Sequence, residues 1–324
     1  MSSAAEIVER LKAGDRAAVA RLISWAENGD PRFGEALGAF FERVGRAWRT
    51  GVTGPPGAGK STLVNELAGL QRGADNSVGI LAVDPSSPFS GGALLGDRIR
   101  MEERSADPGV FIRSMASRGS HGGLARAAID ACDVMDAFGF EELLVETVGV
   151  GQAEFDVMEA VDTVLVVLCP GAGDGIQAMK AGLLEVADVL VVNKAEVAGA
   201  ERLQTDLEDA VALRRRDQGA WETPVISCSA GRGEGIEGVW EATERHRAYL
   251  GGEGRLEARR LRLRLAQVRG AVAAGLDRRL WGTGELAERA RELLAASATP
   301  YDVADDLLAD VSAGLSEPEE IAGS

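Results

Sequence analysis

One short segment, residues 54–61, constrains the fold of this chain more than any other. It reads Gly-Pro-Pro-Gly-Ala-Gly-Lys-Ser and matches the pattern G-x-x-x-x-G-K-[ST]. A predicted strand over 48–53 precedes it, and a helical pattern over 60–70 follows. In a strand–loop–helix unit of this kind, backbone N–H groups converge on phosphate oxygens, and the helix N-terminus adds partial positive charge. The pattern therefore predicts a phosphate-binding loop, formed by Gly54, Pro55, Pro56, Gly57, Ala58, Gly59, Lys60, Ser61 and Thr62.

Apolar stretches and helical patterns alternate regularly from residue 47 to residue 250. Several of these stretches are apolar throughout, which is typical of strands that helices cover on both faces. Regular strand–helix alternation predicts a mostly parallel sheet with right-handed crossovers, so we expect a three-layer α/β fold of the P-loop NTPase type. The predicted strands are 48–53, 78–83, 110–112, 143–145, 163–168, 189–192 and 225–227, and the helices between them are 60–70, 123–138, 177–186, 200–215 and 235–249.

Helical segments flank this P-loop domain, which is assigned to residues 47–250, on both sides. Residues 1–46 show apolar positions at helical spacing and are predicted to form an N-terminal helical extension. A glycine-rich hinge at 251–254 precedes residues 255–324, which are predicted to form a C-terminal helical arm.

The arm carries one apolar stripe, whose members are spaced by four, three, four and four residues along a helix. An apolar stripe of this kind packs either on the α/β core or on another subunit. We expect a dimerisation arm, with packing on the core of the same chain as the alternative. The stripe consists of Leu261, Leu265, Val268, Val272 and Leu276.

A second motif, Asn193-Lys194-Ala195-Glu196, follows the apolar stretch 189–192. GTPases carry N-K-x-D at such a place, and the aspartate accepts two hydrogen bonds from guanine that adenine cannot donate. Glu196 keeps the carboxylate but moves it by one methylene group, so the motif favours guanine and leaves adenine as an alternative. An S-A pair after the next strand supports the base in GTPases through a backbone N–H. The predicted base-binding residues are Asn193, Lys194, Glu196, Ser229 and Ala230.

Acidic residues at strand ends are the third group of candidates. Asp84 and Glu146 each end an apolar stretch, where a carboxylate can hold the Mg²⁺ shell opposite the phosphate loop. Asp97 lies in a glycine-rich loop and would complete the site, with a solvated loop acid or a helix cap as the alternative. Lys60 is placed for the β- and γ-phosphates and the Ser61 hydroxyl for Mg²⁺. We therefore predict Lys60, Asp97 and Glu146 as catalytic residues, and Ser61, Asp84, Asp97 and Glu146 as metal ligands.

The group that orients the attacking water is not evident from these motifs. GTPases of the Ras type carry a glutamine directly after D-x-x-G, whereas this chain has Val150 there and Gln152 two positions later. We therefore predict slow intrinsic hydrolysis that a partner accelerates.

The charge balance and the lack of long apolar runs argue against two classes of partner. The chain has 35 Lys and Arg against 51 Asp and Glu, a formal net charge of −16, whereas nucleic-acid binding needs clustered positive charge. The arginines within 255–264 form one of two local basic stretches. No apolar run reaches the roughly 18 residues that span a membrane, and residues 1–16 lack the apolar core of a signal peptide. We expect a cytoplasmic protein that binds neither nucleic acid nor membranes, with Cys132, Cys169 and Cys228 as buried reduced thiols.

Four segments together resemble the MeaB/ArgK family of P-loop GTPases. The first, 83–101, reads Val-Asp-Pro-Ser-Ser-Pro-Phe-Ser-Gly-Gly-Ala-Leu-Leu-Gly-Asp-Arg-Ile-Arg-Met, and the third, 146–152, reads Glu-Thr-Val-Gly-Val-Gly-Gln. The others are 117–124 and 170–180, and the similarity runs from about residue 11 to residue 250. Family members commonly carry N-K-A-D where this chain has Glu196, which keeps the choice of base open.

This resemblance implies a function that the motif spacing alone does not. Members look like GTPase chaperones of adenosylcobalamin-dependent acyl-CoA mutases, methylmalonyl-CoA mutase above all, which gate cofactor loading and protect the mutase. It implies GTP or GDP and Mg²⁺ as cofactors, and a homodimer. Ser61, Asp97 and Glu146 would form the Mg²⁺ shell with Asp84 nearby, and Asp174 and Lys180 would belong to a switch loop that responds to the partner.

Two other classes of function stay open as alternatives. Older names for the family describe an ATP-dependent kinase or ATPase accessory to amino-acid (LAO/AO) transport, but a kinase needs an acceptor pocket that no motif here supplies. A GTPase that delivers a metal such as nickel needs soft or imidazole ligands. The chain has only His121 and His246, far apart in sequence, and no C-x-x-C motif.

Overall fold

The computed structural model describes residues 3–84, 104, 106–116, 123–147, 158, 160–171, 182–213, 219–282, 284–296 and 298–316. The chain divides into two compact units, Met1–Gln267 and Val268–Ser324. Each unit is considered by itself.

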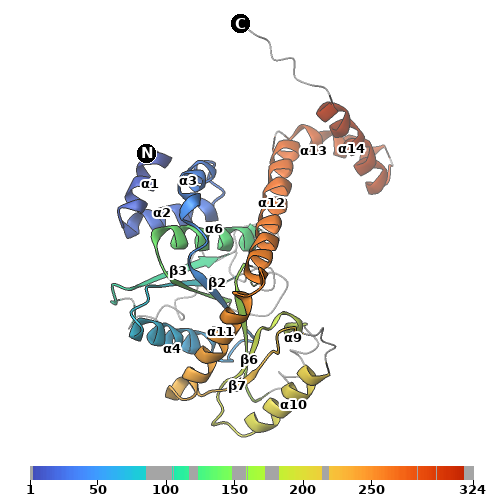
Figure 1. Cartoon of the computed structure of the whole chain (residues 1–324). Coiled ribbons are helices and arrows are strands. Elements are labelled where there is room, and N and C mark those ends of the chain that lie inside the picture. Colours follow the sequence, from blue (N-terminus) through green and yellow to red (C-terminus); the bar gives the residue numbers. More distant parts are fainter. Residues whose placement is uncertain are drawn as a thin grey trace. The chain divides into compact units, whose positions relative to one another are not determined.

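The first unit is built around a seven-stranded sheet with the order β3-β2-β4-β1-β5-β6-β7 (Figure 1). Every pair of neighbouring strands is parallel, which confirms the predicted P-loop NTPase type of α/β fold. Each predicted strand is present, and three are longer at their ends than predicted. The strands are β1 (Trp48–Thr53), β2 (Val78–Asp84), β3 (Val110–Ala116), β4 (Glu142–Thr147), β5 (Thr163–Leu168), β6 (Val189–Val192) and β7 (Val225–Ser227).

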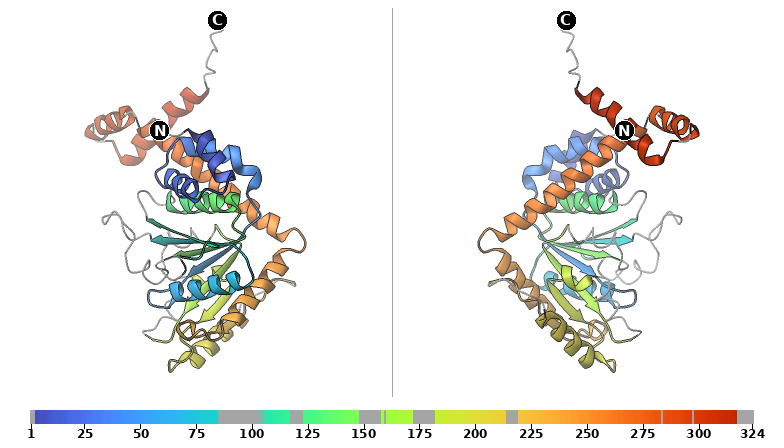
Figure 2. Two further views of the ribbon diagram at one scale, coloured as in Figure 1. Left: turned by 90° about the vertical axis from the view of Figure 1, so that its left-hand side faces the viewer. Right: turned by 90° about the vertical axis from the view of Figure 1, so that its right-hand side faces the viewer.

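Helices cover both faces of this sheet. Helices α4 (Lys60–Gly73) and α11 (Ile236–Leu250) pack on one face, and α6 (Gly123–Phe138) and α10 (Ala200–Ala212) pack on the other. The two views of Figure 2 show α4 and α6 on opposite sides of the strands. The central strands are apolar throughout because both of their faces are buried between helices. Shorter elements complete this unit: η1 (Phe41–Arg43), α9 (Leu183–Val186) and η2 (Ala230–Arg232).

Three N-terminal helices form an extra layer outside α6, with α1 and α2 in contact with it. The helical spacing over residues 1–46 did not indicate where one helix ends and the next begins, and the structure ends α1 and starts α2 around Gly14. Gly14 has a φ of 85°, a conformation that glycine adopts without steric cost. Asp15 then caps α2 by accepting a hydrogen bond from the Ala17 N–H at 2.8 Å. The helices are α1 (Ala4–Lys12), α2 (Arg16–Glu27) and α3 (Arg32–Phe40).

Helix α12 (Arg255–Trp281) begins in the first unit and ends in the second. Its apolar stripe is exposed to solvent: Leu261 is 60% exposed and Leu265 is 53% exposed. The other stripe residues, Val268, Val272 and Leu276, are also exposed. Leu261 and Leu265, which belong to the first unit, therefore do not pack on its core, and the dimerisation arm stays a prediction.

The second unit also contains α13 (Glu285–Ala295) and α14 (Pro300–Ser316), which pack against each other. Val303 and Leu307 of α14 are buried. In the parts of the chain that the structure describes, no helix combines the length and the apolar character needed to cross a membrane.

Candidate nucleotide site

The predicted phosphate loop connects the end of β1 to the start of α4. Gly54 has a φ of 145°, and a Cβ atom there would lie 2.0 Å from the carbonyl oxygen of Val167 in β5. Gly57 and Gly59 have φ angles of 78° and 89°. Side chains at these positions would be strained or would collide with neighbouring backbone, so the loop can take this path only with glycine. The path leaves a cradle of main-chain groups in front of the N-terminus of α4.

Lys60 lies inside this loop rather than pointing to solvent. Its side chain is buried, and Nζ donates hydrogen bonds to the carbonyl oxygens of Gly54 at 2.8 Å and Pro55 at 3.0 Å. A buried ammonium group beside the first turn of a helix makes the loop electropositive. This arrangement suits an anion such as a phosphate group.

Ser61, at the start of α4, lies next to Glu146, near the end of β4. The Ser61 hydroxyl donates a hydrogen bond of 2.6 Å to Oε1 of Glu146, and both residues are buried. Just behind them, the Thr147 hydroxyl donates to the Thr53 hydroxyl at 2.9 Å. A hydroxyl and a carboxylate at the mouth of a phosphate loop are hard oxygen donors of the kind that Mg²⁺ prefers.

Asn193, directly after β6, joins the base-side motif to the phosphate loop. Its Nδ2 donates to the Ala58 carbonyl oxygen at 2.8 Å, and its Oδ1 accepts from the Ala230 N–H at 3.0 Å. A Cβ atom on Gly59 would lie 2.3 Å from Nδ2 of Asn193. Three segments far apart in the sequence therefore meet at one side chain.

Glu196 and Ser229 face each other in the same region. The Ser229 hydroxyl donates a hydrogen bond to Oε2 of Glu196, and this bond lowers the pKa of Glu196 below its ordinary value. Lys194 has a φ of 59°, a rare conformation for a residue with a side chain. The Ala195 N–H donates to the Cys228 carbonyl oxygen at 3.0 Å, which ties this turn to the segment after β7.

The structure brings together the predicted residues of the phosphate loop, Glu146 and the base-side motif. Asp84 is described only through its backbone, at the end of β2, one residue past Val83, which pairs with Thr147 of β4. The remaining predicted or discussed positions lie outside the described residues: Asp97, Asp174, Lys180, Val150, Gln152 and His121.

The three cysteines are free and buried, as the sequence predicted. Burial raises the pKa of Cys132 and of Cys228 to about 12, so both remain thiols at neutral pH. Cys228 donates from Sγ to Oδ1 of Asn193 at 3.5 Å, a packing role behind the base-side motif. Neither this contact nor the contact between Asn193 and Ala58 could be predicted from a motif.

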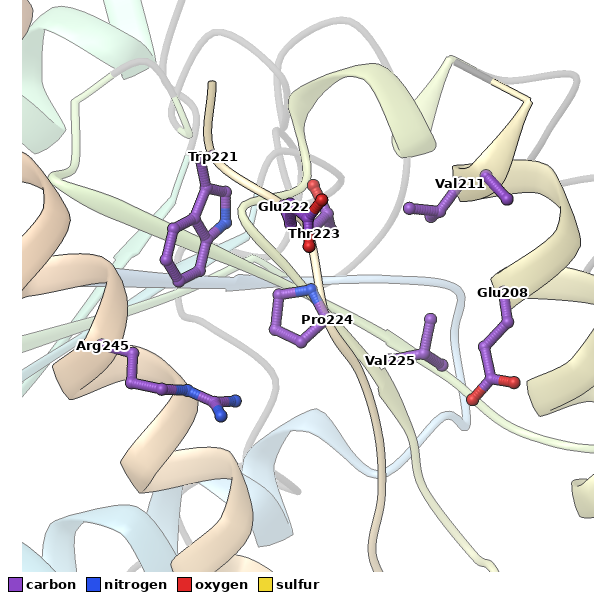
Figure 3. A pocket seen from close by; sticks show the side chains of 9 residues that line it. Glu208, Val211, Trp221, Glu222, Thr223, Pro224, Val225 and Arg245 are labelled. Atoms are coloured by element: carbon purple, nitrogen blue, oxygen red, sulfur yellow. The ribbon is translucent and has the colours of Figure 1, made fainter. Parts of the chain in front are cut away.

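A separate hollow of about 500 Å³ lies beside strand β7, between α10 and α11 (Figure 3). Trp221, Pro224 and Val225 form its apolar walls, and Glu208 and Arg245 lie at its rim. None of the described residues that line it belongs to the phosphate loop or the base-side motif. We therefore keep it apart from the candidate nucleotide site.

The chain is similar to proteins that are named as GTPases. The model of a family described as methylmalonyl-CoA mutase-associated GTPase MeaB matches residues 19–285. A provisionally named GTPase of Pyrococcus abyssi is 45% identical over 315 residues, which cover 95% of this chain and 97% of its own. GTPase ArgK of Escherichia coli is 37% identical over 263 residues, 78% of each chain.

Two further proteins extend these similarities. The mitochondrial methylmalonic aciduria type A homolog of Mus musculus is 36% identical over 264 residues, 76% of this chain and 64% of its own. The crystal structure of a LAO/AO transport system kinase matches with a TM-score of 0.73 at 27% identity, and covers 95% of this chain and 97% of its own. The family model alone spans well over half of the sequence, and relatives above 30% identity agree with it. The chain belongs to the MeaB family and is a P-loop GTPase.

Proposed function

We propose that this GTPase is a chaperone that gates adenosylcobalamin loading of a cobalamin-dependent acyl-CoA mutase and protects that mutase, with methylmalonyl-CoA mutase as the first candidate. One observation carries the proposal: a complete phosphate loop is joined through Asn193 to a base-side motif, in a chain matched over 19–285 by a family described by its association with that mutase. Hydrolysis at this loop would then time an event on another enzyme.

The residues present fit a guanine nucleotide and a magnesium ion. Gly54, Pro55, Pro56, Gly57, Ala58, Gly59 and Thr62 would surround the phosphates. The glycines, Ala58 and Thr62 would offer main-chain N–H groups, which the two prolines lack, and Thr62 would add its hydroxyl. Lys60 would exchange its carbonyl partners for phosphate oxygens. Ser61 and Glu146 would hold Mg²⁺, with Asp84 and Asp97 as further oxygen donors. Mg²⁺, when bound, would neutralise charge on the β- and γ-phosphates. Asn193, Lys194, Glu196, Ser229 and Ala230 would bind the base.

The catalytic assignment is part of the same proposal. Lys60 would stabilise negative charge on the transferred phosphoryl group, and Glu146 and Asp97 would orient the metal and the attacking water. Asp174 and Lys180 would belong to the loop that responds to the partner. Val150 stands where a water-orienting glutamine would be, so we expect slow turnover of the isolated protein.

The exposed stripe on α12 supports a homodimer. Exposed leucines and valines at helical spacing indicate a protein–protein contact rather than a solvated surface. Sedimentation velocity of the wild type and of a Leu265→Glu, Val272→Glu variant tests this. We expect a wild-type dimer that the variant reduces to a monomer, and a wild-type monomer at micromolar concentration would contradict the dimer.

A pull-down tests the mutase role directly. The immobilised chain is loaded with GDP or with a non-hydrolysable GTP analogue and incubated with purified methylmalonyl-CoA mutase, and with an unrelated acyl-CoA enzyme as control. We expect retention of the mutase that differs between the two nucleotide states. Equal retention of both enzymes would leave the GTPase activity standing and remove the chaperone role.

The proposal also includes the location and the other partners of the chain. We propose a cytoplasmic protein that binds neither nucleic acid nor membranes.

The second candidate is an ATP-dependent kinase or ATPase accessory to amino-acid transport. The observation that favours it is the similarity to the structure named as a LAO/AO transport system kinase. Steady-state hydrolysis of GTP and ATP, measured side by side, separates the two candidates. A clear preference for ATP would support the kinase and contradict the chaperone GTPase.

A further inference from the structure

Residues 255–267 of α12 contact the first unit through charged side chains, while Leu261 and Leu265 face solvent and Leu256 and Leu263 are half-buried. Over its first part, Arg259, Arg260 and Arg264 contact the domain, whereas Leu261 and Leu265 are exposed. We call these three arginines the arginine face. An amphipathic helix on a globular domain normally does the reverse, with its apolar side buried.

Each member of the arginine face binds a carboxylate in two-pronged fashion. Arg259 donates to Asp188 at 2.8 and 3.2 Å, and Arg260 donates to Asp162 at 2.7 and 2.9 Å. Pairs of parallel hydrogen bonds between a guanidinium group and a carboxylate are among the strongest polar contacts in proteins.

Arg264 makes the third contact of this kind. It donates to the two oxygens of Asp133 at 2.6 and 2.9 Å, and Asp133 also accepts from Arg49 at 2.7 Å. Burial alone would raise the pKa of Asp133, but Arg49 and Arg264 outweigh it and hold the pKa below its ordinary value. One turn further along α12, Gln267 donates to Asp130 at 2.7 Å.

Two of the three carboxylates that receive the arginine face lie where strands begin, and the third, Asp133, lies in helix α6. Asp162 directly precedes β5, and Asp188 directly precedes β6. Arg49, the second partner of Asp133, is the second residue of β1. In a parallel sheet these starts lie at the edge opposite the strand ends, where β1 leads into Gly54 and β6 leads into Asn193. The arginine face is thus linked to the far ends of the strands that carry the nucleotide motifs.

Every one of these carboxylates also keeps a partner that does not belong to α12. Asp133 keeps Arg49, and Asp162 accepts from the Arg49 N–H at 3.1 Å. Asp188 accepts from the Val164 N–H at 2.8 Å. If α12 moved away, water would enter and none of the three carboxylates would be left buried without a partner. The large penalty for stranding a buried charge therefore does not oppose release of the helix.

Residues 255–267 of α12 do not pack closely by backbone against the first unit. Among the described elements, none packs along α12 as closely as α2 packs along α6. The contacts with the first unit are made instead by long arginine side chains, whose guanidinium groups reach its carboxylates.

From these observations we propose that residues 255–267 of α12 are a releasable ionic dock. Through the arginine face the helix binds to the starts of β5 and β6 and to Asp133 of α6, which also pairs with Arg49 of β1, and it can leave while the sheet stays folded. By linkage, an event that shifts these strands changes how firmly α12 is docked, and docking in turn affects the strands. This inference rests on the described contacts alone and does not depend on which partner the GTPase serves.

Hydrogen exchange on the full chain tests the dock. An Arg260→Gln, Arg264→Gln variant removes two of the contacts, and an Arg262→Gln, Arg269→Gln variant makes the same change of charge at exposed positions of the same helix. We expect amides of 255–267 to exchange at least about tenfold faster in the first variant and within about twofold of wild type in the second, with β1 and β5 protected in both. An Arg260→Lys, Arg264→Lys variant keeps the charge without the forked geometry and should fall between them.

Two results would overturn the proposal. The first is equal exchange of 255–267 in the docked-face variant and its matched control. The second is loss of protection in β1 and β5 together with 255–267, including failure of the variant to fold, because the arginines would then be part of the folded core. In the wild type, raising NaCl from about 0.1 M to about 1 M should also speed exchange in 255–267, since salt screens partly exposed ion pairs.

Discussion

The two edges of the central sheet are polar in different ways. At the edge where strands end, the contacts are made by backbone and amide groups: Asn193 donates to the Ala58 carbonyl oxygen, and the charged Lys60 rests on carbonyl oxygens of its own loop. At the edge where strands start, Asp162, Asp188 and the neighbouring Asp133 of α6 are matched by guanidinium groups from β1 and α12.

This difference separates binding from stability within one sheet. A site for an anionic ligand needs donors that have no strong internal partner, and a loop of glycine backbone supplies them at little steric cost. Buried carboxylates at the other edge already have full partners, so they contribute to the folded state and not to ligand binding. Mutations at the two edges should therefore produce different phenotypes, and four experiments test how strict that division is.

The largest effect is expected for Asp133→Ala, in α6 beside the start of β1. Removing the carboxylate takes from Arg49 its 2.7 Å partner, leaving the longer 3.2 Å contact with Asp136, and takes from Arg264 its partner as well, which should lower the free energy of unfolding by about 3 to 5 kcal/mol. Urea unfolding measures it, and Asp206→Ala on the exposed face of α10 should cost less than about 1 kcal/mol. GTP turnover per folded molecule should stay close to wild type. A large loss of turnover without a loss of stability would contradict the assignment of this edge to stability rather than to ligand binding.

Lowering the pH should destabilise the fold at the same edge of the sheet, where His246 lies buried beside Thr163 and Asp188. Burial is the main cause that lowers the pKa of His246 from 6.5 to about 4. The unfolded chain binds a proton below pH 6.5 that the folded chain does not bind until about pH 4. The contribution of this group to stability is therefore complete above pH 6.5 and is lost as the pH falls through 4.

The difference between these two pKa values corresponds to about 3 kcal/mol. Chemical unfolding of the wild type and of His246→Gln from pH 7 to pH 4 measures it, since the variant lacks this proton uptake. The wild type should lose about 3 kcal/mol more than the variant over that range. Parallel profiles for the two proteins would show that His246 is charged in the folded state.

Lys60→Ala should change activity and leave the fold in place. If Lys60 stabilises the phosphoryl group, its loss should slow GTP hydrolysis by about 100-fold or more, as for other single donors to a transition state. Phosphate release under saturating GTP measures the rate, with Lys12→Ala on α1 as a control for the loss of one lysine. Turnover that stays within about threefold of wild type would remove the phosphate loop as the site of hydrolysis.

The smallest effect is expected at the base side, for Glu196→Gln. The variant keeps the size of the side chain and its hydrogen bond from Ser229, but presents an amide where a carboxylate would accept from guanine. We expect GDP to bind about tenfold more weakly, about 1.4 kcal/mol, with little change for ADP. Fluorescence titration measures both, and Glu237→Gln on α11 is the matched control. An equal loss for GDP and ADP would mean that Glu196 does not select the base.

Most of the sheet could be predicted because its information is local. Stretches such as 163–168 and 189–192 are apolar throughout, and their bounds coincide with β5 and β6. The break at Gly14 was missed because Ile7, Leu11 and Val19 fit helical spacing on either side of it. Hydrophobic periodicity does not detect one glycine that ends a helix and an aspartate that caps the next.

The candidate site divides in the same manner. The phosphate loop lies within eight consecutive residues, so its path between β1 and α4 followed from the motif. The bond between Asn193 and Ala58 joins positions 135 apart and left no trace in the sequence. The arginines of 255–264 were interpreted as a basic stretch because their partners, Asp133 for Arg264 and Asp162 for Arg260, lie 131 and 98 residues away.

The close approach of Asn193 to Gly59 has a consequence for how this protein can change. The amide nitrogen of Asn193 occupies space that any side chain at position 59 would need, with 2.3 Å between them. An alanine at 59 would push out the asparagine, and its first effect would appear at the base end of the nucleotide. If Asn193 binds the base and the loop binds the phosphates, as proposed, neither function can change without affecting the other, and a double-mutant cycle of Gly59→Ala with Asn193→Ala should be strongly non-additive.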